Sequence, residues 1–144
     1  MENDIAVRCQ HISKTYDTGA QKVHALNDVN LDIPFGELMM LVGPSGCGKT
    51  TLISVIAGIL DQDEGRCEIF GQDMKDLKPK ERIHFRGKNI GFVFQAFNLL
   101  PTLTVAENVA IPLIINGMKR QQAIEMGKEA LAQVGLGGRV NNLP

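Results

Sequence analysis

The sequence predicts an α/β fold organised around one glycine-rich loop. Three consecutive features lead to this prediction. Residues 38–42 form a short, continuous apolar run of the kind found in fully buried strands. A glycine-rich stretch, residues 43–48, follows it directly. Residues 49–58 then place apolar side chains at helical spacing and end near Gly58, a typical residue for the end of a helix.

Composition and charge exclude several classes of protein. The 144 residues suffice for one domain with a core, and 44% hydrophobic with 22% charged residues is typical of a soluble globular protein. A net charge of −1 gives no reason to expect a nucleic-acid partner. The longest apolar stretch, Val109–Ile115, contains a proline and is too short to span a membrane. The acidic start, residues 1–4, lacks the apolar region of a secretory signal.

The cysteines indicate a reducing compartment. Cys9, Cys47 and Cys67 are odd in number and widely spaced, which favours reduced thiols over a disulfide framework or a metal site. Together with the composition, this pattern predicts a cytosolic protein.

The N-terminal third predicts antiparallel strands. Residues 5–11 alternate loosely between apolar and polar side chains, and residues 23–33 alternate more clearly. The turn signal Asp17–Ala20 lies between them, so we expect the two strands to be antiparallel neighbours. A further short strand is expected at residues 66–70, after the polar turn 61–65.

The next segment predicts a short helix and a second buried strand. Pro79 is suited to the first turn of a helix over residues 78–86. Residues 90–94 read Ile-Gly-Phe-Val-Phe and predict a buried strand that ends at Gln95.

Two helices are predicted in the last third. Thr104 and Glu107 form a capping-box pattern at the start of the first, which should run to about residues 116–117. Pro112 should bend that helix or end it early. The second is an amphipathic helix over residues 120–134 that stops at Gly135.

The motif with the clearest chemistry begins at residue 43. It has two glycines separated by four residues and followed by Lys and Thr, which is the phosphate-loop pattern. Its residues are Gly43, Pro44, Ser45, Gly46, Cys47, Gly48, Lys49 and Thr50. A random chain of this length matches the pattern with a probability on the order of 1%. The alternative is a glycine turn before a helix, but the apolar run before the motif and the apolar helix after it favour the phosphate loop.

Each residue type in this motif meets a physical need. Glycines permit the backbone angles that turn successive N–H groups toward an anion. The helix that begins at Lys49 adds the positive end of its dipole and its unpaired N–H groups. Lys49 supplies a mobile charge to the β- and γ-phosphates, and the Thr50 hydroxyl is a ligand for Mg²⁺.

With these residues in hand, the chain resembles the nucleotide-binding domain of ABC transporters over essentially its whole length. Gly-Pro-Ser-Gly-Cys-Gly-Lys-Thr-Thr, residues 43–51, is similar to the family's own phosphate loop, which adds Thr51 to the site. Residues 13–16, Ser-Lys-Thr-Tyr, resemble the segment whose aromatic ring stacks on adenine, so the resemblance implies this role for Tyr16. Taken alone, Tyr16 would be interpreted as a half-buried strand residue.

A second stretch of the resemblance surrounds Gln95. Residues 91–95 and 97–101 resemble the family's Q-loop, which implies that Gln95 touches Mg²⁺ and the attacking water. A neutral amide oxygen can bind a hard cation without adding charge. Without the family, Gln95 would be interpreted as a solvated loop residue. The amino-acid sequence of Asn98–Val109 most resembles that of the lipoprotein-release and macrolide-export subfamily.

The resemblance also implies a division of the chain. We expect a P-loop NTPase core that is incomplete here, an ABC-type antiparallel β subdomain, and the start of the helical subdomain. Residues 1–36 and 61–75 would be mainly antiparallel β. Residues 37–60 and 88–95 would form the P-loop core, and residues 96–144 the Q-loop and the start of the helical subdomain.

The function implied is that of an ATP-binding, energy-coupling subunit of an ABC exporter. Such a subunit binds ATP with Mg²⁺ at Gly43–Thr51, with Lys49 and Gln95 as catalytic candidates. Its expected partners are a second ATPase subunit and a membrane permease subunit that contacts Gln95–Val109, with no nucleic acid. The expected location is cytoplasmic, peripheral on the inner face of the cell membrane.

Hydrolysis is expected to need more than these residues. The sequence ends at Pro144, where the family continues into its signature motif, Walker B aspartate, catalytic glutamate and switch histidine. His11, His24 and His84 are scattered and offer no replacement. We therefore expect an ATPase as the full-length protein and an inactive chain in isolation. The alternatives are a non-transport ABC nucleotide switch in DNA repair or translation, and a structural unit that binds no nucleotide.

Overall fold

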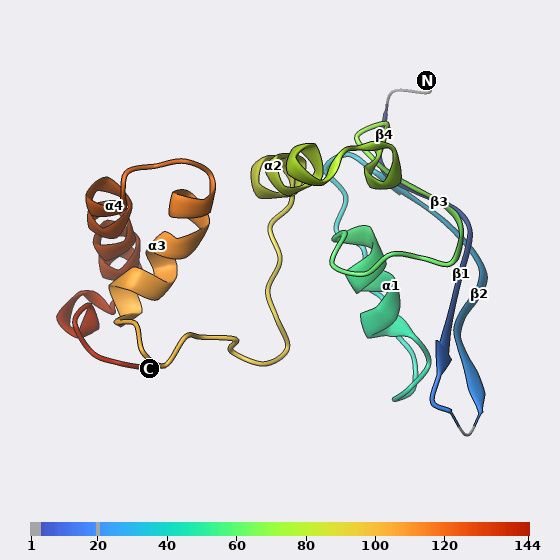
Figure 1. The fold of residues 1–144 in the computed structure, drawn as a ribbon, viewed down its shortest axis with the longest axis horizontal. Helices are drawn as coiled ribbons and strands as arrows, with labels where there is room; N and C mark the ends of the chain where they lie inside the picture. Colours follow the sequence, from blue (N-terminus) through green and yellow to red (C-terminus); the bar gives the residue numbers. More distant parts are fainter. Residues whose placement is uncertain (1–3, 20) are drawn as a thin grey trace. The chain divides into compact units, whose positions relative to one another are not determined.

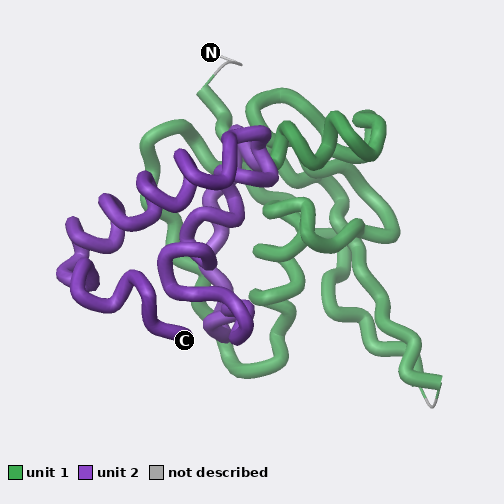
Figure 2. Tube along the Cα trace, turned by 60° about the vertical axis from the view of Figure 1, so that its left-hand side comes forward, with its two compact units in different colours: residues 1–86 green, residues 87–144 purple. Residues whose placement is uncertain are grey.

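The computed structural model describes residues 4–19 and 21–144. The acidic start at residues 1–3 and the end of the predicted turn at Ala20 therefore lie outside the described residues. The chain divides into two compact units, residues 1–86 and residues 87–144, which Figure 2 draws in different colours. Each unit is described below by itself.

The first unit contains an antiparallel sheet of four strands in the order β2-β1-β3-β4 (Figure 1). Its strands are β1 (Ile5–Asp17), β2 (Lys22–Pro34), β3 (Glu64–Ile69) and β4 (Gln72–Asp73). The predicted antiparallel pairing of the first two strands is confirmed. β1 is longer than the predicted 5–11, because residues beyond His11 keep pairing with β2 across several register shifts.

Helix α1 (Lys49–Ile56) packs on β1, β2 and β3. Leu52 and Val55 are buried on its inner side, and the buried strand residues include Ile12, Leu26 and Ile69. Burying one such side chain stabilises a fold by roughly 1.5–3 kcal/mol. The helix ends as the sequence predicts, with Gly58 in the left-handed region at φ 63°. This core fixes the start of α1, and hence the glycine-rich loop, against the sheet.

Two predicted strands do not form. Residues 37–42 and 90–94 have irregular backbone, and Leu38 and Val93 are 90% and 95% exposed. A strand exists only when its backbone groups pair with a neighbour, and neither segment pairs with another strand in the described part of the chain. The apolar pattern predicts burial in a sheet, but a local pattern does not supply the neighbouring strand that the segment would need.

Helix α2 (Pro79–Asn89) opens at Pro79, as predicted, and extends to Asn89 instead of Arg86. A short 3₁₀ helix, η2 (Met74–Asp76), precedes it and was not predicted. The carboxylate of Asp73 caps η2 by accepting the backbone N–H of Lys75.

The second unit is built on α3 (Val105–Ile115) and α4 (Arg120–Gln133), which pack against each other and are followed by the 3₁₀ helix η3 (Gly137–Arg139). Small residues line their contact: Ala106, Ala110 and Ala123 are buried, and a Cβ at Gly127 would lie 3.0 Å from the Ala106 carbonyl oxygen. The helices therefore approach closely along this stripe.

The ends of these helices follow the sequence with one exception. The capping box of Thr104 and Glu107 is present, and Gly135 ends the last helix region at φ 77°. Pro112, however, lies inside α3 without ending it early. Only one turn follows the proline, and both the backbone and the side-chain amide of Asn116 donate to the Pro112 carbonyl, at 3.1 and 3.0 Å. These bonds hold the last turn in place.

Among residues 4–19 and 21–144, no helix is long and apolar enough to cross a bilayer.

Candidate functional site

The glycine-rich loop turns sharply before α1 and rests on strand β2. Gly46 and Gly48 have φ of 80° and 90°, a region that side chains with a Cβ rarely adopt. A Cβ at Gly48 would also collide with the carbonyl oxygen of Ala25 in β2. Glycine at position 48 is therefore required both by the backbone angle and by the close contact with the sheet.

The start of α1 presents unpaired N–H groups. Gly48 is the N-cap residue, no side chain caps the helix, and its first turn contains no acidic residue. The first backbone N–H groups of a helix have no partner within the helix, and the helix dipole makes this end positive. Such an end favours an anion. The first intrahelical bond on Gly48 runs from Leu52 N–H to its carbonyl, at 2.9 Å.

The ammonium of Lys49 folds back over the loop. Its Nζ donates to the carbonyl oxygens of Gly43 and Pro44, at 2.7 and 2.6 Å, and lies 3.5 Å from the Cys47 Sγ. A positive charge, the glycine backbone and the open end of α1 therefore converge on one small region. An oxyanion with several oxygens, such as a phosphate chain, fits this set of donors.

Most of the remaining residues of the predicted site are exposed. Ser45, Gly46 and Cys47 are exposed in the loop, Thr50 is exposed in the first turn of α1, and Thr51 is half-buried. Among the described residues, no group of three His, Cys, Asp or Glu side chains could hold a metal. The donor offered to a cation here is the Thr50 hydroxyl, an oxygen of the kind that Mg²⁺ accepts when phosphate oxygens supply further ligands. The metal role of Thr50 stays a prediction.

Tyr16 lies at the same end of the sheet as the loop. It is 40% exposed and sits opposite Val23 near the end of β1. The loop contacts the sheet at Leu26, because a Cβ added at Gly48 would lie only 3.2 Å from the Leu26 Cδ2. Leu26 in turn pairs with Lys14 in β1. Tyr16 is two residues beyond Lys14, roughly 7 Å along the strand. An exposed aromatic ring therefore stands about two strand residues from the loop's contact with the sheet.

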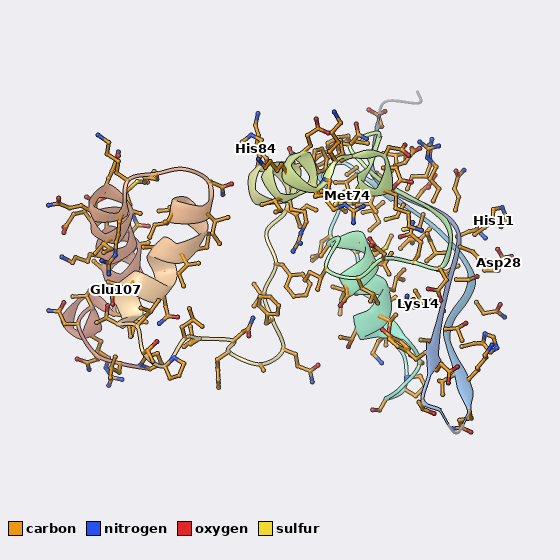
Figure 3. All side chains as sticks on the ribbon, in the orientation of Figure 1. His11, Lys14, Asp28, Met74, His84 and Glu107 are labelled. Atoms are coloured by element: carbon orange, nitrogen blue, oxygen red, sulfur yellow. The ribbon has the colours of Figure 1, made fainter. Side chains whose placement is uncertain are left out.

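The segment before Tyr16 is held by Asp63, a residue that the sequence did not single out. Its carboxylate accepts the Lys14 ammonium at 2.6 Å and the Thr15 N–H at 2.7 Å, while its own N–H donates to Ser13 at 2.9 Å. The hydrogen bond from Lys14, followed by that from Thr15, lowers the pKa of the Asp63 carboxyl. Figure 3 shows Lys14 on the side of β1 that faces α1, whereas His11 and Asp28 lie on the opposite side. Lys14 also lies 6.0 Å from the Tyr16 ring centroid, a cation–π contact.

Gln95 belongs to the second unit, whereas the loop belongs to the first. Its side chain is exposed and its backbone irregular. Because the two lie in different units, the role of Gln95 in binding Mg²⁺ and water stays a prediction.

The stretch after Gln95 is apolar and exposed but locally fixed. Phe97, Leu99 and Leu100 present their side chains to solvent. Asn108 in α3 holds the end of this stretch: its Nδ2 lies 3.0 Å from the Leu100 and Leu103 carbonyls, and its Oδ1 accepts the Leu100 N–H at 2.8 Å. An exposed apolar segment with a fixed backbone is suited to contact another protein.

Comparison with known proteins identifies the family. The sequence model described as ABC transporter matches residues 26–143, which include the loop and the second unit up to residue 143. The chain belongs to the ABC transporter family. The predicted α/β fold class is confirmed as well, because the chain matches solved ABC cassettes.

The chain covers only part of the length of the relatives that it matches. An uncharacterised ABC transporter ATP-binding protein of Mycobacterium tuberculosis is 42% identical over 94% of the chain and 41% of the relative. The lipoprotein-releasing system ATP-binding protein LolD of Wigglesworthia glossinidia brevipalpis is 34% identical over 100% of the chain and 63% of the relative. The chain thus spans about two fifths to three fifths of the length of these proteins.

A solved structure agrees with this assignment. The ATP-binding cassette MJ0796, described as dimeric, in a post-hydrolysis state and bound to ADP and Pi, matches with a TM-score of 0.86 and 37% identity. The match covers 96% of the chain and 61% of the cassette.

Proposed function

We propose that the chain is the nucleotide-binding part of an energy-coupling ATPase subunit of an ABC exporter, and that it binds Mg-ATP at Gly43–Thr51. The observation that supports this most strongly is the position of the Lys49 ammonium. It lies on the carbonyls of residues 43 and 44, beside the open N-terminus of α1. A mobile charge and free N–H groups in one place suit the β- and γ-phosphates of a nucleotide.

Two groups of residues would bind different parts of the nucleotide. The loop backbone and Lys49 would hold the phosphates, while Tyr16 would stack on the adenine ring. Asp63 and Lys14 fix the strand that carries Tyr16, so the ring is positioned before a ligand arrives. Thr50 would contribute a hydroxyl to Mg²⁺, which lowers the negative charge of the phosphates when it is bound. Gln95 would contribute its amide oxygen to the same cation.

The transport role is supported by the relatives and by the second unit. LolD is named as the ATP-binding protein of a lipoprotein-releasing system, and the MJ0796 cassette is described as a dimer. By analogy, the chain would pair with a second ATPase subunit and dock on a membrane permease through Gln95–Val109, at the inner face of the membrane. The exposed apolar side chains of Phe97, Leu99 and Leu100 suit that contact. The relatives do not favour the alternative of a nucleotide switch in DNA repair or translation.

A titration with shortened nucleotides tests the proposed binding mode. ATP, ADP, AMP and adenosine are added to the chain with Mg²⁺, and heat of binding is measured for each. Because the loop is suited to the outer phosphates, ATP and ADP should bind much more tightly than AMP and adenosine. Equal affinity for ATP and AMP would show that the loop does not hold the phosphate chain.

A further inference from the structure

Two free thiols face each other across the sheet, away from the exposed phosphate loop. Cys9 in β1 and Cys67 in β3 are direct partners in the antiparallel register. Their sulfurs are 3.6 Å apart, and the residues are only 1% and 3% exposed. The third cysteine, Cys47, is exposed in the loop.

The sheet already places these residues at the spacing of a disulfide. The pairs Val7 with Ile69 and Arg8 with Glu68 continue the same ladder and fix its register. Directly opposite residues in an antiparallel ladder have Cα atoms about 4.5 or 5.5 Å apart, depending on their place in the ladder. Both values lie within the range of roughly 4.4–6.8 Å that disulfides span. The two sulfurs therefore need only side-chain rotation to come within bonding distance.

We propose that Cys9 and Cys67 form a redox modification site, in which a small peroxide converts the two thiols to a disulfide that joins β1 to β3. The sequence had indicated three reduced thiols with no disulfide framework. The reduced state is what the structure shows, and the register adds an oxidised state that spacing along the chain did not reveal, because the two cysteines are 58 residues apart.

The environment gives the two sulfurs different roles. The two thiols share a hydrogen bond in which either sulfur could be the donor, and this bond lowers the pKa of Cys9. The same bond, together with burial and the negative charges of Asp73 and Glu68, raises the pKa of Cys67. Cys9 is therefore the sulfur that attacks, since the thiolate is the nucleophile.

The reaction proceeds in two steps. The Cys9 thiolate attacks one oxygen of hydrogen peroxide, the O–O bond breaks, and hydroxide leaves, so that Cys9 becomes a sulfenic acid. The Cys67 sulfur then attacks the Cys9 sulfur, the S–OH bond breaks, and the departing hydroxide takes up the Cys67 proton as water. In sum, two thiols and one peroxide give one disulfide and two waters.

The burial of the Cys9 and Cys67 sulfurs determines which oxidants can reach them. A bulky disulfide such as oxidised glutathione cannot reach sulfurs that are almost fully covered, whereas peroxide is close to water in size. Once Cys9 is oxidised to the sulfenic acid, the Cys67 thiol lies close to it, with 3.6 Å between the two sulfurs. Disulfide formation should therefore be faster than further oxidation of Cys9 to the sulfinic acid.

The cross-link would stabilise the first unit. It closes a chain segment that includes β2, the phosphate loop and α1, and a cross-link over such a long segment restricts the unfolded chain. For a unit of this size, the expected rise in Tm is on the order of 10 °C.

The test uses the 144-residue chain with Cys47→Ser, which removes the competing exposed thiol. The chain is treated with hydrogen peroxide, free thiols are alkylated, and the intact mass and peptides are measured. We expect a loss of about 2 Da, the two thiol hydrogens, a peptide that links Cys9 to Cys67, a higher Tm, and reversal of all three by dithiothreitol. Cys9→Ala in the same background is the control and should show none of them.

Three results would overturn the proposal. The first is a chain whose two thiols remain alkylatable at peroxide levels that oxidise Cys47 in the unmodified protein. The second is sulfinic acid on either cysteine without the linked peptide. The third is a Cys9–Cys67 link found only between two chains. The mass measurements on the Cys47→Ser chain decide these outcomes even if the core variant Cys9→Ala does not fold.

Discussion

Replacing Asn108 with alanine should loosen the segment in front of α3, residues 100–104, which is called the α3 loop below. The Asn108 side chain accepts the Leu100 N–H at 2.8 Å, and its two amide hydrogens are shared among the carbonyls of Leu100, Leu103 and Thr104, at 3.0, 3.0 and 3.1 Å. It thus makes about three hydrogen bonds at once. A hydrogen bond contributes roughly 0.5–1.5 kcal/mol, and water replaces part of the loss at the exposed Leu100. We therefore expect Asn108→Ala to destabilise the α3 loop by about 2 kcal/mol.

Hydrogen exchange provides the assay for this prediction. A loss of about 2 kcal/mol corresponds to roughly 30-fold faster exchange of amides that open with the α3 loop, the Leu100 amide above all. The exposed residue Asn141 serves as the matched control, and Asn141→Ala should leave the exchange of residues 100–104 unchanged. Unchanged exchange of the Leu100 amide in Asn108→Ala would show that other contacts hold the α3 loop and that our hydrogen-bond count is wrong.

Three further predictions concern reactivity, acid and association. Maleimide should label the exposed Cys47 before the two buried cysteines, and bound Mg-ATP should slow this labelling. An equal labelling rate with and without nucleotide would show that Cys47 lies outside the site. Hydrogen bonds from the Thr104 backbone and hydroxyl, then from Arg120, lower the pKa of Glu107 below its usual 4.5, so the folded state binds fewer protons. Stability should therefore fall as pH drops below about 4.5, and an acid titration of Glu107→Gln should show a weaker fall; identical curves would contradict this role. The exposed apolar side chains of residues 38–42 should make the chain associate as its concentration rises, and a lysine at position 40 should reduce the association measured by light scattering; a wild-type chain that stays monomeric would refute this.

Local sequence patterns predicted the elements that need only local information. The phosphate loop and α1 follow from glycine spacing and an apolar helix face, and the start of α3 follows from Thr104 and Glu107. In each case the interactions that define the element lie within a few residues of one another. The structure agrees with these predictions to within about two residues at the helix ends.

Features that depend on distant partners could not be predicted in this way. Residues 37–42 and 90–94 have the apolar pattern of strands, but a strand needs a neighbour to pair with, and none of the described strands pairs with them. Asp63 meets Lys14 across 49 positions, and Cys9 meets Cys67 across 58. These contacts depend on the register of the sheet, which a single sequence does not show.

The central claim is that Lys49 and the loop bind the phosphates of Mg-ATP, and a calorimetric titration of variants tests it most directly. Removing a charge that several phosphate oxygens share should cost about 3 kcal/mol, so Lys49→Ala should weaken Mg-ATP binding about 100-fold. Tyr16→Ala should weaken it less, by about tenfold, because the partly exposed ring offers one stacking face. Lys128→Ala, which removes an exposed lysine of α4, should leave the affinity unchanged. Unaltered binding by Lys49→Ala, or equal losses from the Lys49 and Tyr16 variants, would contradict the proposed site.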